Sequence, residues 1–336
     1  MRLLTIHDHG DLVVSELIGV ARLDPALASY DVLERVHAIR RCCHVEANPV
    51  EPFMCVADLS AFLRYPPASE PRRYWLASGA DEIVGFAQLA PIVGSPVADA
   101  SILVLPEWRR RGAGAALLAA VTSEARANGC TTLTGSYATD AGQRFAASVG
   151  ASPTRRDIRS VLLLAQAEVE AFAVPGYQLR SWNGRAPNDL VESFAEAREA
   201  INDAPAAAED EWHAWDVEKV RDLERVIAQR GRQIRVTVAV DDAGTVVAYT
   251  ELRVSTYRDA IATTEDTAVR AAHRRHGLAL SVKSEALRRL RDERTDVTLV
   301  GATNAESNLA MLAINRRLGF KAVAAFTGCA LPLGRA

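Results

Sequence analysis

The chain has 336 residues, of which 49% are apolar and 24% are charged, a composition typical of globular proteins and long enough for about two domains. Its formal net charge of −3 provides no basic field, which argues against a nucleic-acid partner. No apolar run is long enough to span a membrane, and the first residues lack the apolar core of a signal peptide. Five cysteines without a CxxC pair favour neither a disulfide framework nor a metal site, so we expect a cytoplasmic protein.

Runs rich in apolar and β-branched residues predict strands in chain order. In the first half they lie at residues 3–6, 74–77, 83–91, 97–105 and 132–137, and in the second half at residues 177–182, 234–240, 245–254, 260–269 and 297–302. Helical periodicity predicts a helix at 113–127 and another at 278–292, each between the last two of these strands. A further helix and a final strand complete each half. This order is typical of an α/β or α+β fold.

Three segments recur in the same order in both halves. The matching segments are residues 84–89 and 247–252, residues 104–114 and 269–279, and residues 148–151 and 317–320. The spacing between the copies drifts by only a few residues, so the sequence predicts a duplicated domain rather than a solenoid. We expect an N-terminal domain at 1–164, a linker at 165–176 and a C-terminal domain at 177–336.

The second of these segments carries the strongest chemical signal. In each copy an arginine precedes a glycine by three residues, directly between a strand and a helix: Arg109 and Gly112, then Arg274 and Gly277. Glycine lets backbone N–H groups approach an anion, and the helix N-terminus adds unpaired donors and partial positive charge. One such turn is equally compatible with a plain strand-to-helix connection. Two in matching contexts favour pyrophosphate binding in at least one copy.

The segment from Val104 to Gly114 resembles the acetyl-CoA signature of the GNAT superfamily. The C-terminal half resembles a tandem-GNAT subgroup through residues 249–252, 265–269 and 304–308. The resemblance implies two tandem GNAT-like domains, each a mixed splayed β-sheet flanked by helices, that use acetyl-CoA or another short acyl-CoA. It implies cofactor-binding roles for Leu103, Val104, Arg109, Arg110, Arg111, Gly112, Ala113 and Gly114 in the first copy, and for Ala268, Val269, Arg274, Arg275, His276, Gly277, Leu278, Ala279, Asn304 and Asn308 in the second.

The second copy is the better candidate for catalysis. Acyl transfer to an amine requires a group that removes a proton from the amine, and GNAT enzymes are similar in using a carboxylate or water. We favour Glu251 as this base, because Gln88 replaces it in the first copy, with Glu265 second; either carboxylate is equally compatible with a solvated strand surface. Asn315 stands where many relatives have a tyrosine that protonates the leaving thiolate. An asparagine is not an acid, so that role stays open.

These observations predict an N-acetyltransferase that acts on a small-molecule amine. The alternatives are a non-catalytic acyl-CoA-binding or regulatory protein, an enzyme resembling mycothiol synthase, and a peptide acetyltransferase. We expect no nucleic-acid, membrane or metal partner, and either a monomer or a homodimer.

Overall fold

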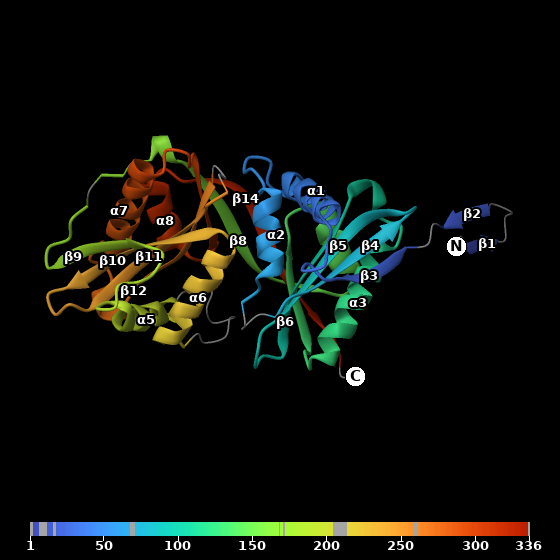
Figure 1. Ribbon diagram of the computed structural model, residues 1–336, viewed down its shortest axis with the longest axis horizontal. Helices are drawn as coiled ribbons and strands as arrows, with labels where there is room; N and C mark the ends of the chain where they lie inside the picture. Colours follow the sequence, from blue (N-terminus) through green and yellow to red (C-terminus); the bar gives the residue numbers. More distant parts are fainter. Residues whose placement is uncertain are drawn as a thin grey trace. The chain divides into compact units, whose positions relative to one another are not determined.

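The computed structural model describes residues 3–6, 12–15, 18–67, 71–167, 169–170, 172–203, 214–257 and 261–334. The chain forms two compact units. Unit 1 comprises Met1–Thr154 and Thr327–Ala336, and unit 2 comprises Arg155–Phe326. Each unit combines a mixed sheet with helices (Figure 1), which confirms the predicted α/β class.

Unit 1 is built on a sheet with the strand order β3-β4-β5-β6-β7-β14. Its strands are β3 (Gly19–Leu23), β4 (Arg73–Gly79), β5 (Glu82–Pro91), β6 (Val97–Val104), β7 (Thr132–Tyr137) and the last part of β14 (Lys321–Pro332). Its helices are α1 (Tyr30–Ala47), α2 (Val56–Arg64), α3 (Ala113–Ala127) and α4 (Asp140–Ser148). The strand expected at 3–6 forms as β1 (Leu3–Ile6), but it pairs with β2 (Leu12–Ser15) in a separate hairpin.

The two faces of β5 pack against different helices. Phe86 is fully buried and lies beneath Arg40 of α1, whereas the neighbouring Gly85 faces α3. A Cβ atom at Gly85 would lie 3.0 Å from Leu117 of α3, so the absent side chain lets this helix approach the sheet closely. Alternating side chains along one strand thus bury the core on both of its faces.

Unit 2 has the strand order β8-β13-β12-β11-β10-β9. Its strands are β8 (Ser152–Leu163), β9 (Tyr177–Asn183), β10 (Arg232–Asp241), β11 (Val246–Ser255), β12 (Ile261–Val269) and β13 (Leu299–Ala305). Its helices are α5 (Val191–Arg198), α6 (Val217–Gln229), α7 (Leu278–Glu293) and α8 (Leu309–Arg317). Tyr249 packs with residues of α5 and α6, while its neighbour Ala248 packs with Leu278 of α7. Helices α5 and α7 therefore cover opposite faces of the sheet (Figure 1).

The last strand of each sheet is supplied by the other copy of the repeat. Strand β8 follows the helices of the first copy but pairs antiparallel with β13, from Leu163↔Leu299 to Asp157↔Ala305. Strand β14 ends the second copy but pairs with β7, from Thr327↔Tyr137 to Pro332↔Thr132. The compact units therefore differ from the predicted domain limits, since residues 155–164 belong to unit 2 and residues 327–336 to unit 1.

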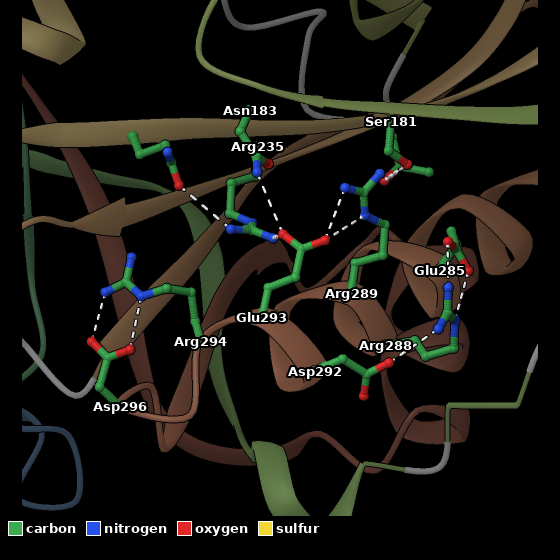
Figure 2. A network of polar contacts seen from close by, with 12 residues as sticks. Ser181, Asn183, Arg235, Glu285, Arg288, Arg289, Asp292, Glu293, Arg294 and Asp296 are labelled. Carbon is green, nitrogen blue, oxygen red and sulfur yellow. Dashed lines mark hydrogen bonds and ion pairs between the residues drawn. The ribbon is translucent and has the colours of Figure 1, made fainter.

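A network of charged side chains anchors the C-terminal end of α7 (Figure 2). Glu293 accepts hydrogen bonds from Arg235 of β10 and from Arg289 one turn earlier. Burial alone would raise the pKa of Glu293, but the hydrogen bonds from both arginines lower it to about 2. Arg288 extends the network along the helix through Glu285. These contacts fix the helix whose first turn carries the glycine loop.

Within the described ranges, no helix combines the length and the apolar character that a membrane crossing requires.

Removal of the residues after Phe326 is expected to destabilise unit 1, although they are far from it in the sequence. The truncation deletes the β14 ladder on β7 and the buried side chain of Leu333, which is 4% exposed. We expect the free energy of unfolding to fall by at least about 2 kcal/mol, the value of burying one leucine. Denaturant unfolding followed by circular dichroism measures it. A chain ending at Gly334 is the control. Equal stability of the two truncated chains would contradict the pairing of β14 with β7 in unit 1.

Candidate active site

The parallel strands in the middle of each sheet pair over only a short length. In unit 2, β12 and β13 pair from Ile261↔Leu299 to Thr264↔Ala302. After these positions β12 remains paired with β11 and β13 remains paired with β8, but no register pair joins these two described strands to each other. Strands β6 and β7 of unit 1 likewise pair only from Val97↔Thr132 to Asp99↔Thr134. Each sheet therefore opens between its parallel strands.

A β-bulge lies beside the opening in unit 2. Strands β11 and β12 pair at Thr250↔Thr267 and next at Leu252↔Thr264, so Glu265 and Asp266 together stand opposite Glu251. A bulge breaks the alternation of side chains and lets two consecutive residues reach the same face. The corresponding strands of unit 1, β5 and β6, pair without a register shift.

The bulge carboxylates belong to an ion-pair network on the α5 face of the sheet. Arg198, at the end of α5, donates from Nη1 to Glu251 Oε2 at 2.7 Å and from Nη2 to Asp266 Oδ2 at 3.2 Å. Arg253 donates from Nε to the other oxygen of Glu251 at 3.0 Å and lies 3.4 Å from Glu265 Oε2. The side chain of Glu251 is 1% exposed, whereas those of Glu265 and Asp266 are 29% and 38% exposed.

The network separates the proton affinities of its carboxylates. Burial alone would raise the pKa of Glu251, but the charges of Arg198 and Arg253 hold that pKa below its usual value. For Asp266, burial dominates over the attraction of Arg198, so its pKa is raised. Glu251 is thus an inaccessible, stabilised anion, which is the wrong environment for the base expected there. Asp266, which sequence reasoning did not select, is the more accessible of the two and the better proton acceptor.

The loop arginines of both copies turn toward their own strand. Arg274 donates from Nε to the Val269 carbonyl at 3.0 Å and also pairs with Asp203. Arg109 makes the matching contact to the Val104 carbonyl at 3.1 Å and also pairs with Glu46. Both side chains therefore hold the strand end and the loop together, although each remains partly exposed.

The loops after these arginines share an uncommon backbone. Arg110 and Arg275 adopt positive φ angles of 62° and 67°, and the glycine N-caps of α3 and α7 are also left-handed. Neither N-cap provides a side-chain hydrogen bond to the first turn of its helix. Successive N–H groups in such a turn form an anion-binding concavity at the positive end of the helix. Strained backbone of this kind is often retained at functional sites.

Other side chains of the predicted loop sites have structural contacts. Leu278 and Ala113 are buried in the cores of their units. The His276 ring nitrogen lies 3.2 Å from the His273 carbonyl. A Cβ atom at Gly114 would lie 3.2 Å from Phe145, which explains a small residue there.

Three asparagines predicted at the site lie close together in the chain: Asn304 on β13, Asn308 at the N-cap of α8 and Asn315 within α8. Asn315 donates from Nδ2 to Asn304 Oδ1 at 2.7 Å, and its own buried Oδ1 has no hydrogen-bond partner among the described residues. Asn304 belongs to the part of β13 that has left β12. Asn308 instead caps α8, since its Oδ1 accepts a hydrogen bond from the Met311 amide. The orphaned amide oxygen of Asn315 fits a ligand that donates a hydrogen bond near the opening.

Comparison with known proteins assigns the chain to a family. The sequence model of the acetyltransferase (GNAT) family matches residues 33–150 and residues 194–320, once in each copy. The chain belongs to the GNAT acetyltransferase family. No curated protein sequence matches it.

Solved structures extend this GNAT assignment to the whole chain. A tandem GNAT protein from the clavulanic acid biosynthesis pathway, solved without acetyl-CoA, is 27% identical with a TM-score of 0.81. The match covers 95% of this chain and 100% of that one. A GCN5-related N-acetyltransferase from Sphaerobacter thermophilus shares the fold at 17% identity and a TM-score of 0.71, over 98% and 97% of the two chains. The predicted tandem GNAT architecture is confirmed.

Glu251→Gln is expected to destabilise unit 2, because it leaves Arg198 and Arg253 without their shared buried carboxylate. Breaking a buried ion pair costs about 3–5 kcal/mol. The pKa of Glu251 is lower in the folded protein than in the unfolded chain, where it is about 4.3. The ion pairs of Glu251 therefore add fully to the free energy of unfolding above that pH, and this stabilisation is lost as the pH falls through the folded pKa.

Denaturant unfolding at pH 7 and near pH 3 measures this difference. The variant should be less stable at pH 7 and closer to wild type at the lower pH. The exposed pair Arg156–Glu306 supplies the control Glu306→Gln, which should change stability by less than about 0.5 kcal/mol. Equal effects of the two substitutions would contradict the role given to the network.

Proposed function

We propose that this protein transfers an acetyl group from acetyl-CoA to a small-molecule amine, and that unit 2 carries the reaction. The observation that carries the proposal is the Glu265–Asp266 bulge, which presents two partly exposed carboxylates beside the strand opening. Carboxylates attract an ammonium group and can receive its proton. Similarity to a tandem GNAT protein of a biosynthetic pathway supports a small-molecule acceptor over a peptide.

The glycine loops fit the pyrophosphate of acetyl-CoA. They offer left-handed turns and uncapped helix N-termini, and the unpaired edge of β12 at Ala268 and Val269 offers backbone groups for the pantetheine arm. Bound acetyl-CoA supplies a thioester whose carbonyl carbon is the electrophile. The amide pair of Asn304 and Asn315 would hold polar atoms of the same arm, through the free oxygen of Asn315.

Several features support unit 2 as the catalytic copy. The bulge occurs on β12 and not on β6, and Gln88 replaces Glu251. In our proposal Asp266 takes the proton from the ammonium, with Glu265 as the second carboxylate at the site. Glu251 acts through Arg198 as a positioning residue, because it fixes the guanidinium that holds Asp266. We therefore propose Asp266 as the base in place of Glu251, which sequence reasoning favours.

Gly277→Asp is expected to weaken acetyl-CoA binding by at least about tenfold. The substitution puts a carboxylate where anion-binding N–H groups are required, in a backbone with φ of +83°. Isothermal titration calorimetry measures the affinity. Gly112→Asp tests the matching loop of unit 1 and should affect turnover less.

Gly244→Asp is the matched control, because Gly244 has φ of +81° in a hairpin turn with open space around it. It adds the same charge to a similarly left-handed backbone outside the loop. It lacks one steric contact, since a Cβ atom at Gly277 would lie 2.9 Å from Phe172. Wild-type affinity of Gly277→Asp, or equal weakening in the control, would overturn the assignment of the loop.

Asp266→Asn is expected to lower kcat by roughly 10²-fold while leaving acetyl-CoA affinity nearly unchanged, as for loss of a general base. The deficit should shrink at high pH, where an alkylamine with a pKa of about 10.4 sheds its own proton. Steady-state rates with a panel of small amines, measured from pH 6 to 10, test this.

Asp292→Asn on the surface of α7 is the control, since its carboxylate is 50% exposed and pairs only within the helix surface network. An Asp266→Asn variant that folds normally and keeps the wild-type rate and pH profile would eliminate Asp266 as the base. Acetyl-CoA binding without turnover of any amine would favour the non-catalytic alternative.

A further inference from the structure

Arg40 of unit 1 occupies the place that Arg198 holds in unit 2. Phe86 and Tyr249 are matching positions of the repeat. Arg40 Cζ lies 5.4 Å from the centroid of the Phe86 ring, and Arg198 Cζ lies 5.5 Å from that of Tyr249. Both guanidinium groups thus lie over the same aromatic position of a central strand. In each unit an acid that pairs with the loop arginine follows a few residues later. Glu46, the partner of Arg109, comes six residues after Arg40, and Asp203, the partner of Arg274, comes five residues after Arg198.

The partners of the two arginines differ. Arg198 is paired with the carboxylates of Glu251 and Asp266. In unit 1 Gln88 replaces Glu251, and its register partner on β6 is Ser101, which carries no charge. Arg40 forms no ion pair or hydrogen bond with any residue that the structure describes, and its Nε atom is buried.

The surroundings of Arg40 make its positive charge unfavourable unless an anion binds there. Burial, together with the nearby charge of Arg72, lowers the pKa of Arg40 to about 10. The two guanidinium groups lie over the same ring, that of Phe62, at 5.7 Å and 4.3 Å from its centroid. Asp99, an acid further along the same face of β6, acts instead on Cys329. A partly buried guanidinium without a counter-ion among the described residues is unfavourable, and in unit 2 the matching arginine is neutralised by carboxylates.

We propose that unit 1 binds the carboxylate of a small organic acid at Arg40, in the place that Asp266 fills beside Arg198 in unit 2, where unit 1 has the smaller Ser101. The rings of Phe62 and Phe86 flank the guanidinium and would contact the apolar body of the acid. The inference depends on Arg40 alone, because Arg72 has further partners of its own. It is independent of the reaction proposed for unit 2.

Two sources of carboxylate are compatible with this chemistry: a free acid, and an acyl chain that ends in a carboxylate on a CoA thioester. Calorimetric titration with sodium phenylacetate tests the first, and comparison of succinyl-CoA with acetyl-CoA tests the second. Sodium phosphate and sodium chloride at equal ionic strength control for unspecific anion binding. We expect saturable binding of phenylacetate, or a higher affinity for succinyl-CoA than for acetyl-CoA, with no binding of either inorganic anion.

Two variants assign the binding to Arg40. Arg40→Gln removes the guanidinium, and Gln88→Glu introduces the carboxylate that unit 2 has at this position, so each should weaken carboxylate binding by at least about tenfold. The control for the first is Arg35→Gln, a charge removed from the same helix, where Arg35 pairs with Glu82. The control for the second is Gln143→Glu on the exposed surface of α4.

Both controls should bind as the wild type does. If Arg40→Gln fails to fold, Gln88→Glu still decides the question, because it restores a charge pairing that the fold already uses. Unchanged binding in Gln88→Glu would overturn the proposal. So would equal binding of phosphate, or failure of the wild type to bind either carboxylate probe.

Discussion

The early end of pairing between β12 and β13 is the constraint on which the site depends. Parallel strands in a sheet are normally covered along their length, and their backbone groups are satisfied by each other. Here the ladder stops at Thr264↔Ala302, and the bulge at Glu265 and Asp266 turns β12 away at that point. The result is an edge of free backbone groups inside the sheet rather than at its margin. The glycine loop follows the same strand by a few residues, so one strand positions both the proposed phosphate site and a pair of carboxylates.

The two copies retain the frame and differ in its charges. Arg109 and Arg274 tie the strand end to the loop in the same way, and Arg110 and Arg275 share the same left-handed backbone. Such agreement shows that the loop geometry is conserved within the chain. The face covered by α1 or α5 is different, because Arg198 is neutralised by carboxylates, whereas Arg40 has no such partner among the described residues. The two copies therefore share the geometry of the strand end and the glycine loop but differ in the charges on the neighbouring face of the sheet.

Sequence reasoning found what depends on local pattern. The strand, loop and helix order and both glycine loops follow from residues within about thirty positions of each other, and the structure has them in that order. The exchange of β8 and β14 could not be predicted, because the pattern of a strand does not say which neighbour it pairs with. The proposed base Asp266 could not be selected from the sequence for a related reason. Strict alternation puts it and Glu265 on opposite faces, and only the bulge brings both to one.

The proposal moves the base from Glu251 to Asp266 because of a contact between residues far apart in the sequence. Arg198 lies 53 positions before Glu251 in the chain. The sequence around Glu251 therefore does not indicate that this carboxylate is buried and ion-paired. A carboxylate that differs between the two copies suggests a gain of basic function, whereas in the structure Glu251 is ion-paired with Arg198 and Arg253. The comparison of copies is informative in a different way, since it identifies Arg40 as an arginine without the counter-ions that Arg198 has.

Hydrogen–deuterium exchange with and without acetyl-CoA tests the central claim most directly, since it reports on backbone N–H groups at each candidate site. The account predicts that acetyl-CoA slows exchange in the loop and first turn of α7, residues 275–280, and along the free edge of β12, residues 265–269. Binding that slows exchange elsewhere and leaves both of these segments unchanged would contradict it.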